Sequence, residues 1–138
     1  MSHVYMFSAG EWLYSSISFA RELSPELPAV RIDATQIKRV LINLIDNAIE
    51  ALDGSGTVTI ETTLDKTAGI VRVSVADDGP GISQEARAKL FVPSFSTKRR
   101  GTGLGLAIVS LIVREHHGSI RVEDNEPAGA RFVVELPA

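Results

Sequence analysis

The sequence predicts a single α+β domain in which helices pack against one β-sheet. Two segments, residues 33–54 and 103–117, have the apolar periodicity of amphipathic helices, and residues 57–63 and 70–76 have the composition of strands. The chain has 138 residues and is 44% hydrophobic, so it is long enough to bury a core of its own. No repeat or low-complexity linker divides it.

The first half of the chain is expected to form a strand, a loop and a long helix. Residues 17–22 suit a short strand, and the prolines that follow it mark a loop. Asp33 is a good N-cap residue, and Gln36 three positions later completes a capping-box pattern. The apolar residues of the helix then recur at helical spacing: Ile37, Leu41, Leu44, Ala48 and Leu52.

The second half is expected to alternate between strands and helices. After the strands at 57–63 and 70–76, the glycines and proline of residues 77–81 predict a tight turn. Ser83 suits the N-cap of a short helix over residues 83–90, and an irregular basic loop follows at 93–103. A helix over 103–117 stops at Gly118, and strands at 119–123 and 131–136 end the chain.

Composition excludes several classes of function. The net charge of −3 gives no general basic field for nucleic acid or an acidic membrane surface, and there is no cysteine for disulfides or thiolate metal sites. The three histidines have no familiar metal-binding spacing, and no apolar run approaches the ~20 residues that cross a bilayer. Residues 1–15 are interpreted as a leader or the end of a preceding linker, and residues 16–138 as the domain.

A glycine-rich segment precedes the last helix. Gly101, Gly103 and Gly105 alternate with other residues, which allows a ligand to approach the backbone closely. The free N–H groups of the following helix favour an anion there, such as a nucleotide phosphate. The segment matches neither a P-loop nor a Rossmann fingerprint, so taken alone it is equally compatible with a flexible hinge.

Two polar features elsewhere in the chain are also compatible with nucleotide binding. Asn43 and Asn47 are four residues apart, so both amides project from one face of the first helix. They suit either a polar border beside the core or neutral oxygen ligands for Mg²⁺. Asp77 ends a strand ahead of a glycine-bearing turn, where a carboxylate can accept a hydrogen bond from an exocyclic amine, although taken alone the segment favours an ordinary strand-to-helix turn.

Four motifs in order resemble the N, G1, F and G2 boxes of the sensor histidine kinases. They are Asn-Leu-Ile-Asp-Asn-Ala at 43–48, Asp-Asp-Gly-Pro-Gly-Ile at 77–82, Phe-Val-Pro-Ser-Phe-Ser-Thr-Lys at 91–98 and Gly-Thr-Gly-Leu-Gly-Leu at 101–106. The resemblance covers residues 16–138 and is strongest to the nitrogen-regulation sensor kinases. It implies the Bergerat ATP-binding fold shared with gyrase and MutL, a two-layer α/β sandwich with a mixed sheet and helices on one face.

The resemblance implies ATP and Mg²⁺ as cofactors and assigns roles by motif position. Asp77 would receive the adenine amino group, and the loop containing Gly79, Gly81 and Ile82 would pass beneath the base. Asn47 would coordinate Mg²⁺, while Asn43 would help to hold a phosphate or the water shell of the metal.

The resemblance also implies a lid over the nucleotide at residues 83–102, anchored by Phe91 and Phe95. Lys98 would contact the terminal phosphate and act with Asn43 and Asn47 in catalysis, whereas Arg99 is interpreted as part of a solvated loop. The remaining nucleotide-binding residues of the lid and the following helix would be Thr97, Gly101, Thr102, Gly103, Leu104, Gly105 and Leu106.

The residue type at the position of Asn43 distinguishes enzymes that transfer a phosphoryl group from enzymes that hydrolyse ATP. Members resembling gyrase and MutL carry glutamate at this motif position to deprotonate the attacking water, and asparagine is no general base near neutral pH. The resemblance therefore implies a kinase that donates the γ-phosphoryl group of ATP to a histidine.

The accepting histidine is expected outside this chain. In histidine kinases it lies on a helical dimerisation domain, in a sequence context that His3 lacks, whereas His116 and His117 suit the cap of a helix. The expected partners are therefore that domain, upstream or in trans, and indirectly a response regulator. The isolated chain is expected to be a cytoplasmic monomer without membrane contact, although its parent protein can be membrane-anchored.

Two other functions remain open at this point. One is a nucleotide-gated protein-interaction module, and the other is a serine kinase like the anti-sigma factors, which tend to have glutamate at the position of Asn43. Ala130 also departs from the Gly-Thr-x-Phe pattern of many relatives, which removes a hydroxyl expected near the adenine.

Overall fold

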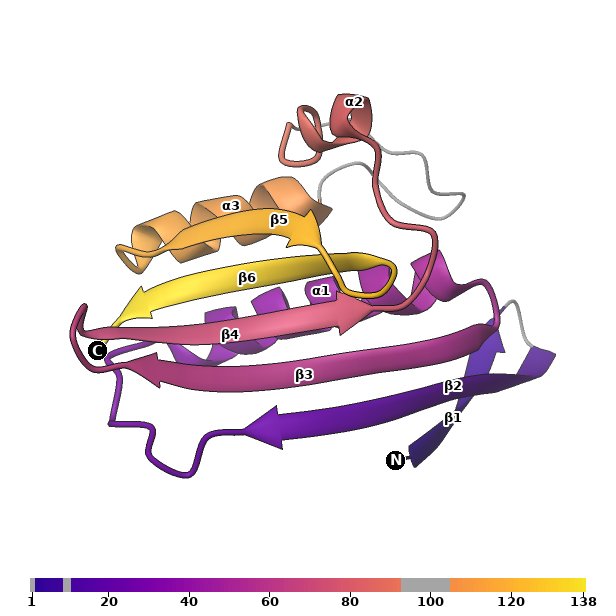
Figure 1. Ribbon diagram of the computed structural model, residues 1–138, viewed down its shortest axis with the longest axis horizontal. Coiled ribbons are helices and arrows are strands. Elements are labelled where there is room, and N and C mark those ends of the chain that lie inside the picture. Colours follow the sequence, from indigo (N-terminus) through magenta and orange to yellow (C-terminus); the bar gives the residue numbers. More distant parts are fainter. Residues whose placement is uncertain (1, 9–10, 93–104) are drawn as a thin grey trace.

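The computed structural model describes residues 2–8, 11–92 and 105–138, with side chains from Ile17 onward. Within these ranges six strands form one sheet (Figure 1). The elements are β1 (Ser2–Ser8), β2 (Glu11–Leu23), α1 (Ala34–Leu52), β3 (Ser55–Asp65), β4 (Ile70–Asp77), α2 (Gln84–Arg87), α3 (Gly105–Glu115), β5 (Ser119–Asp124) and β6 (Ala130–Pro137).

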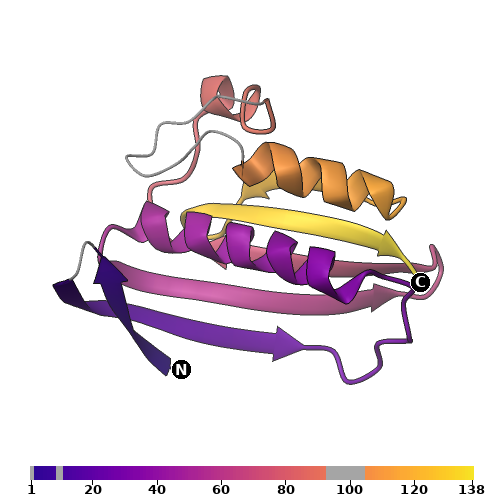
Figure 2. The ribbon, with the colours of Figure 1, turned by 180° about the vertical axis from the view of Figure 1, so that it is seen from behind.

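The sheet is mixed, as the sequence predicts. Its strand order is β1-β2-β3-β4-β6-β5; β2 and β3 run parallel, and the other neighbours run antiparallel. A parallel pair needs a crossover connection, and α1 supplies it between β2 and β3. The predicted α+β class with helices on one face is confirmed: α1 and α3 lie behind the sheet in Figure 1 and in front of it in Figure 2.

The core lies between the sheet and these two helices. Strand side chains alternate between the two faces of the sheet, so every second residue of β3, β4 and β6 points toward the helices. The largest fully buried side chains are Ile17, Val40, Leu44, Val58, Val75, Val109 and Val113. Their burial fixes α1 and α3 against the sheet, and with them the polar residues that these helices carry.

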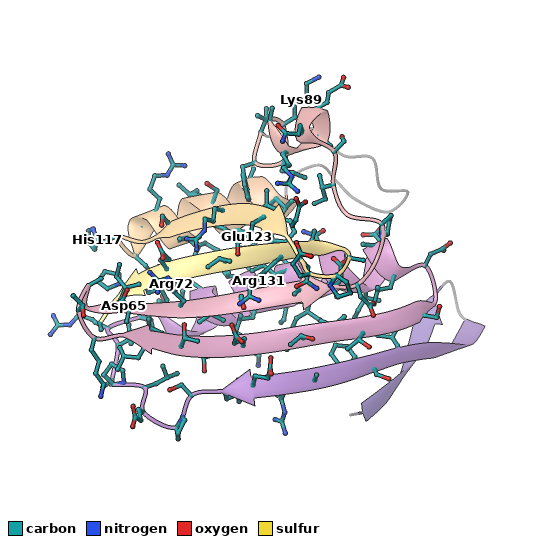
Figure 3. The ribbon with its side chains drawn as sticks, in the orientation of Figure 1. Asp65, Arg72, Lys89, His117, Glu123 and Arg131 are labelled. Atoms are coloured by element: carbon teal, nitrogen blue, oxygen red, sulfur yellow. The ribbon has the colours of Figure 1, made fainter. Side chains whose placement is uncertain are left out.

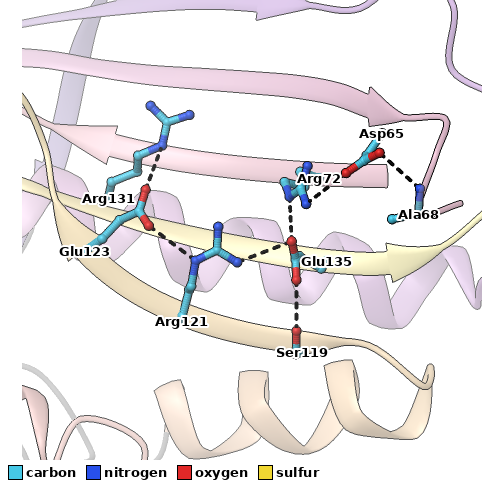
Figure 4. A network of polar contacts seen from close by, with 8 residues as sticks. All are labelled: Asp65, Ala68, Arg72, Ser119, Arg121, Glu123, Arg131 and Glu135. Carbon is cyan, nitrogen blue, oxygen red and sulfur yellow. Dashed lines mark hydrogen bonds and ion pairs between the residues drawn. The ribbon is translucent and has the colours of Figure 1, made fainter. Parts of the chain in front are cut away.

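The opposite face of the sheet carries a connected chain of ion pairs instead of a second helical layer. Figure 3 shows four of its members over the sheet, and Figure 4 shows most of the network from close by. Seven charges alternate in sign along it: Asp65, Arg72, Glu135, Arg121, Glu123, Arg131 and Glu61. These side chains cover small or apolar residues such as Ser74, Ala76 and Val133, which are 3% exposed.

The helix caps agree with the sequence analysis. Asp33 is the N-cap of α1, and its side chain accepts a hydrogen bond from the Gln36 amide at 3.2 Å. The ring of His116, just after the end of α3, lies at the same end of the helix layer as Asp33. Its Nδ1 lies 2.8 Å from the Ile112 carbonyl, and its Nε2 accepts the Asp33 amide at 3.0 Å. His116 therefore caps α3, as expected, and also joins it to the start of α1.

The N-terminal region differs from the sequence analysis. The strand expected at residues 17–22 is part of a longer β2, and β1 pairs with it through Phe7 opposite Trp12 and Ser8 opposite Glu11. Strand β2 therefore runs through residue 16, where the sequence analysis places the start of the domain. Backbone pairing stabilises such an extension whatever the side-chain pattern, so periodicity gives no sign of it.

Candidate functional site

Asp77 lies at the end of β4, where it is 4% exposed. Its Oδ1 accepts the backbone N–H of Gly79 at 2.9 Å and, more weakly, that of Ala130 at 3.4 Å. Burial raises the pKa of Asp77 above its usual value, against the lowering effect of these two amides. Both hydrogen bonds reach the same oxygen, so Oδ2 is not needed by either of them.

The neighbouring Asp78 is held differently. It is exposed, and its Oδ1 accepts the Thr57 amide at the start of β3 at 2.8 Å. The two consecutive carboxylates therefore have separate tasks. Asp78 ties the turn to β3, whereas the carboxylate of Asp77 is buried at the end of β4.

The loop after Asp77 has the backbone form that the sequence predicts. Gly79 contributes its amide to Asp77, and Gly81 has a φ of +81°, in the left-handed region that glycine adopts without strain. Ile82 then packs against the hydrophobic core, which fixes the end of the loop. Ala130 reaches Asp77 through its backbone amide, a contact that does not depend on the missing hydroxyl.

Asn43 and Asn47 lie half-buried on α1, one turn apart. A Cβ atom placed on Gly105 would lie 3.9 Å from Asn43 Oδ1, so the amide of Asn43 sits beside the first residue of α3. The first N–H groups of a helix lack partners within it and carry its positive dipole end. The structure thus brings the amide of Asn43 beside an anion-favouring helix terminus, with Asn47 one turn further along α1.

The stem of the expected lid packs on the core. Ser83 caps α2 by accepting the Ala86 amide at 3.1 Å, as predicted, but α2 ends at Arg87 instead of residue 90 because turns follow it. Phe91 packs edge-on against Phe132 with ring centroids 6.4 Å apart, and Leu106 packs on the core from α3. The other predicted site residues lie outside the described residues: Phe95, Thr97, Lys98, Gly101, Thr102, Gly103 and Leu104.

Sequence reasoning missed two residues that hold this site. Asn125 donates from Nδ2 to the Asp77 carbonyl at 2.9 Å, and Arg87 donates from Nε to the Ile82 carbonyl at 3.2 Å. Asn125 lies 48 residues from its partner, and Arg87 resembles any charged residue of a surface helix. Neither contact leaves a periodic signal in the sequence.

The family described as Histidine kinase-, DNA gyrase B-, and HSP90-like ATPase matches residues 32–138. The chain belongs to this family. The match begins just before Asp33 and includes Asn43, Asn47, Asp77 and Gly105, so all the described candidate residues belong to the ATPase domain.

Relatives of this ATPase domain are sensor histidine kinases. The chain is 43% identical over 111 residues to the sensor histidine kinase ZraS of Escherichia coli O157:H7, covering 80% of this chain and 24% of ZraS. It is 38% identical over 141 residues to the sensory histidine kinase/phosphatase NtrB of Rhodobacter capsulatus, covering 94% of this chain and 39% of NtrB. The chain thus corresponds to the catalytic domain and spans about a quarter to two fifths of these relatives.

Solved structures agree with this assignment. The catalytic domain of histidine kinase ThkA superposes with a TM-score of 0.79 at 43% identity, covering 88% of this chain and 78% of that one. ThkA has also been solved in complex with the response regulator protein TrrA, and there the match has a TM-score of 0.74 at 41% identity, covering 88% of this chain and 34% of that one.

Two features are absent from the described part of the ATPase domain. Among the described residues, no helix has both the length and the hydrophobicity to cross a bilayer. In the same part of the chain, no group of three or more histidine, cysteine, aspartate or glutamate side chains is placed to hold a metal ion.

Proposed function

We propose that this chain binds Mg·ATP and donates its γ-phosphoryl group to a histidine on a dimerisation domain, upstream in the same protein or in trans, within two-component signalling. The observation that carries the proposal is Asn43 beside the start of α3. An amide at this point can position a phosphate but cannot deprotonate water. The arrangement therefore favours transfer to another acceptor over hydrolysis.

The base would bind at the end of β4, within the proposed domain of residues 16–138. Asp77 is buried and has one oxygen clear of its two amide donors, so it can accept the amino group of adenine. Guanine presents a carbonyl oxygen at that position and would be repelled by the carboxylate. Gly79, Gly81 and Ile82 would form the backbone beneath the base.

The phosphates would bind between α1 and α3. Asn47 would be a protein ligand of Mg²⁺ and Asn43 would hold a phosphate oxygen or a metal-bound water, since neutral amide oxygens suit a cation whose charge is already balanced by phosphates. Bound Mg²⁺ supplies charge neutralisation for the transferred group. The amides of Gly105 and Leu106 at the start of α3 would face the same anion.

For the segment before α3, the proposal rests on the amino-acid sequence alone. Phe95 and Thr97 would close over the nucleotide, and Lys98 would contact the terminal phosphate. Gly101, Thr102, Gly103 and Leu104 would wrap the phosphate chain. Loose phosphoryl-transfer transition states depend mostly on such positioning and on positive charge near the phosphoryl oxygens.

The partner would be a helical domain that carries the accepting histidine, and a response regulator would then receive the phosphoryl group from it. ThkA, a relative by structure, has been solved with a response regulator. We expect the isolated chain to be monomeric. Sedimentation equilibrium over a hundredfold concentration range would detect a dimer.

Nucleotide titration tests the binding site. A fluorescent ADP analogue should bind saturably and be displaced by ATP but not by GTP. Asp77→Asn should abolish binding, because an amide N–H₂ then opposes the amino group of adenine, whereas Asp78→Asn is the matched control and should bind normally. Asn47→Asp should alter mainly the Mg²⁺ dependence. Absence of binding at millimolar nucleotide would contradict the proposal.

Transfer is tested with a second protein. The chain, Mg²⁺ and γ-labelled ATP are mixed with a separate histidine-bearing dimerisation domain from ZraS, the relative at 43% identity. We expect acid-labile, base-stable phosphate on that domain and none on this chain. A domain with its accepting histidine changed to glutamine is the control. Tight ATP binding without any transfer would favour an interaction module.

A further inference from the structure

The end of β5 contacts both ends of the loop that would carry the base. This loop runs from Asp77 to Ile82, and the two consecutive residues Asp124 and Asn125 act on its two ends. Each residue acts on a backbone carbonyl of the loop, Asn125 directly and Asp124 through the side chain of Arg87.

Asn125 holds the first end of the loop. Its Nδ2 donates to the Asp77 carbonyl at 2.9 Å in a partly buried contact, and its own amide donates to the Gly129 carbonyl at 3.0 Å. Gly129 has a φ of +99°, and a Cβ atom on it would overlap the same Asp77 carbonyl. The turn between β5 and β6 therefore closes tightly over the backbone of Asp77.

Asp124 holds the second end through Arg87. The carboxylate of Asp124 pairs with Arg87 Nη2, while Arg87 Nε donates to the Ile82 carbonyl at 3.2 Å. The Arg87 side chain is 23% exposed, whereas that of Asp124 is 75% exposed, so the ion pair lies at the surface, where salt weakens it. Helix α2 has no fully buried residue of its own, which makes this guanidinium a main tie between α2 and the loop.

We propose that Asp124 and Asn125 are positioning residues that brace the base loop at both ends and so set the recognition of the adenine amino group. The inference rests on the proposed role of Asp77. With the Asp77 and Ile82 carbonyls tied down, the carboxylate keeps a fixed direction toward the base. Without these two hydrogen bonds the Asp77 carboxylate is still present, but it samples a wider range of orientations. The preference for a ligand with the 6-amino group over one without it then falls.

A ligand pair isolates this effect from general stability. ATP and purine riboside triphosphate differ only in the 6-amino group, so the ratio of their dissociation constants reports the contact to Asp77 and cancels changes that affect both ligands. We would measure both constants by calorimetry on the full chain for the parent, Asn125→Ala and Asp124→Asn, and record the thermal midpoint of each protein.

The parent should prefer ATP. Asn125→Ala should lose about three- to tenfold of that preference, the effect of one hydrogen bond, and Asp124→Asn about two- to threefold, since its ion pair is exposed. Asp124→Glu, which restores the carboxylate, should recover most of it. Glu126→Ala, at the exposed neighbour of Asn125, and Arg121→Lys, in the ion pair with Glu123, are matched controls and should keep the parent ratio.

An unchanged ratio in Asn125→Ala and Asp124→Asn would overturn the proposal, including the case in which only the thermal midpoint falls, because the residues would then be merely structural. Failure of the proposed function looks different. If the parent itself binds the two ligands equally, or if Asp77→Asn keeps the parent ratio, then Asp77 does not read the amino group and the premise is lost.

Discussion

The burial of Asp77 reduces the stability of the folded protein, although it would favour the proposed contact with a base. Burial in the folded protein raises its pKa, so the folded chain retains a proton over a pH range in which the unfolded chain has already released it. Raising the pH through that range therefore costs folding free energy. At neutral pH an ionised, partly desolvated carboxylate would bind an amino group strongly, which offsets this loss of stability when a ligand is bound.

The first prediction follows from the direction of this pKa shift. Asp77→Asn keeps an oxygen that can accept the Gly79 and Ala130 amides but has no charge to desolvate. We therefore compare the free energy of unfolding of the variant with that of the parent at each pH. The difference in favour of the variant should be larger at pH 7 than at pH 3, while nucleotide binding is lost. Urea unfolding at both pH values measures this. Asp78→Asn, at the exposed carboxylate, is the control, and an equal difference at both pH values would contradict the expected desolvation.

His117 is a second residue whose conformation is costly. Helix α3 ends in a Schellman motif: the Gly118 amide donates to the Val113 carbonyl and the His117 amide to the Arg114 carbonyl, each at 3.0 Å. His117 occupies the left-handed position of this motif with a φ of +63°. Glycine is the usual residue there because it has no Cβ.

The second prediction is that His117→Gly stabilises the protein by about 0.5–1 kcal/mol, because relief of left-handed strain outweighs the added entropy of glycine in the unfolded chain. Urea unfolding of the variant measures the gain. Gly69→Ala offers the opposite test at a φ of +67°, and it should destabilise although nothing lies within 4 Å of the added methyl group. If His117→Gly were less stable than the parent, the imidazole ring would contribute more to stability than the left-handed backbone conformation costs.

At the scale of elements, the open face of the sheet is held by charge instead of by a helix. The Arg72 guanidinium, followed by that of Arg121, lowers the pKa of Glu135, and Arg72 also bonds Asp65. Glu135 on β6 thus links Arg72 on β4 with Arg121 on β5, the two strands that flank β6. The network crosses β3, β4, β6 and β5 and covers small side chains that would otherwise meet water.

The third prediction concerns this network. A carboxylate with a lowered folded-state pKa contributes stability above its unfolded pKa and loses it as the pH falls through the folded value. Glu135→Gln should therefore destabilise at pH 7 by at most about 1 kcal/mol, since solvent reaches these partly exposed side chains, and by less in 1 M salt or near pH 3. Thermal unfolding in low and high salt measures it. Glu126→Gln is the exposed control, and a salt-independent loss would point to packing instead of charge.

The elements also show how far sequence reasoning reaches. The caps at Asp33 and Ser83 were predictable because capping depends on residues three positions apart. The parallel pairing of β2 with β3 and the extent of β1 were not, since backbone pairing is set by tertiary placement. Asp77 and Asn43 were found through family motifs, whereas Asn125 and Arg87 act on backbone carbonyls, which no side-chain pattern records.

At the scale of the whole molecule, the proposed nucleotide would join parts that are distant in sequence. Asp77 ends the central strand β4, Asn43 and Asn47 lie on α1, and Gly105 begins α3. A ligand that contacts all three elements binds only the folded chain. Its binding free energy therefore adds to the stability of the entire domain, by about 2.7 kcal/mol at a hundredfold excess over the dissociation constant.

The fourth prediction is the resulting rise in the thermal midpoint. With Mg²⁺ and a hundredfold excess of ATP over its dissociation constant, the midpoint should rise by roughly 5–15 °C. GTP at the same concentration should raise it little, because its base offers Asp77 a carbonyl oxygen. Differential scanning fluorimetry measures both, with Asp77→Asn as the unresponsive control. An equal rise with GTP and ATP would mean that the phosphates alone are bound, between α1 and α3, and that the end of β4 does not read the base.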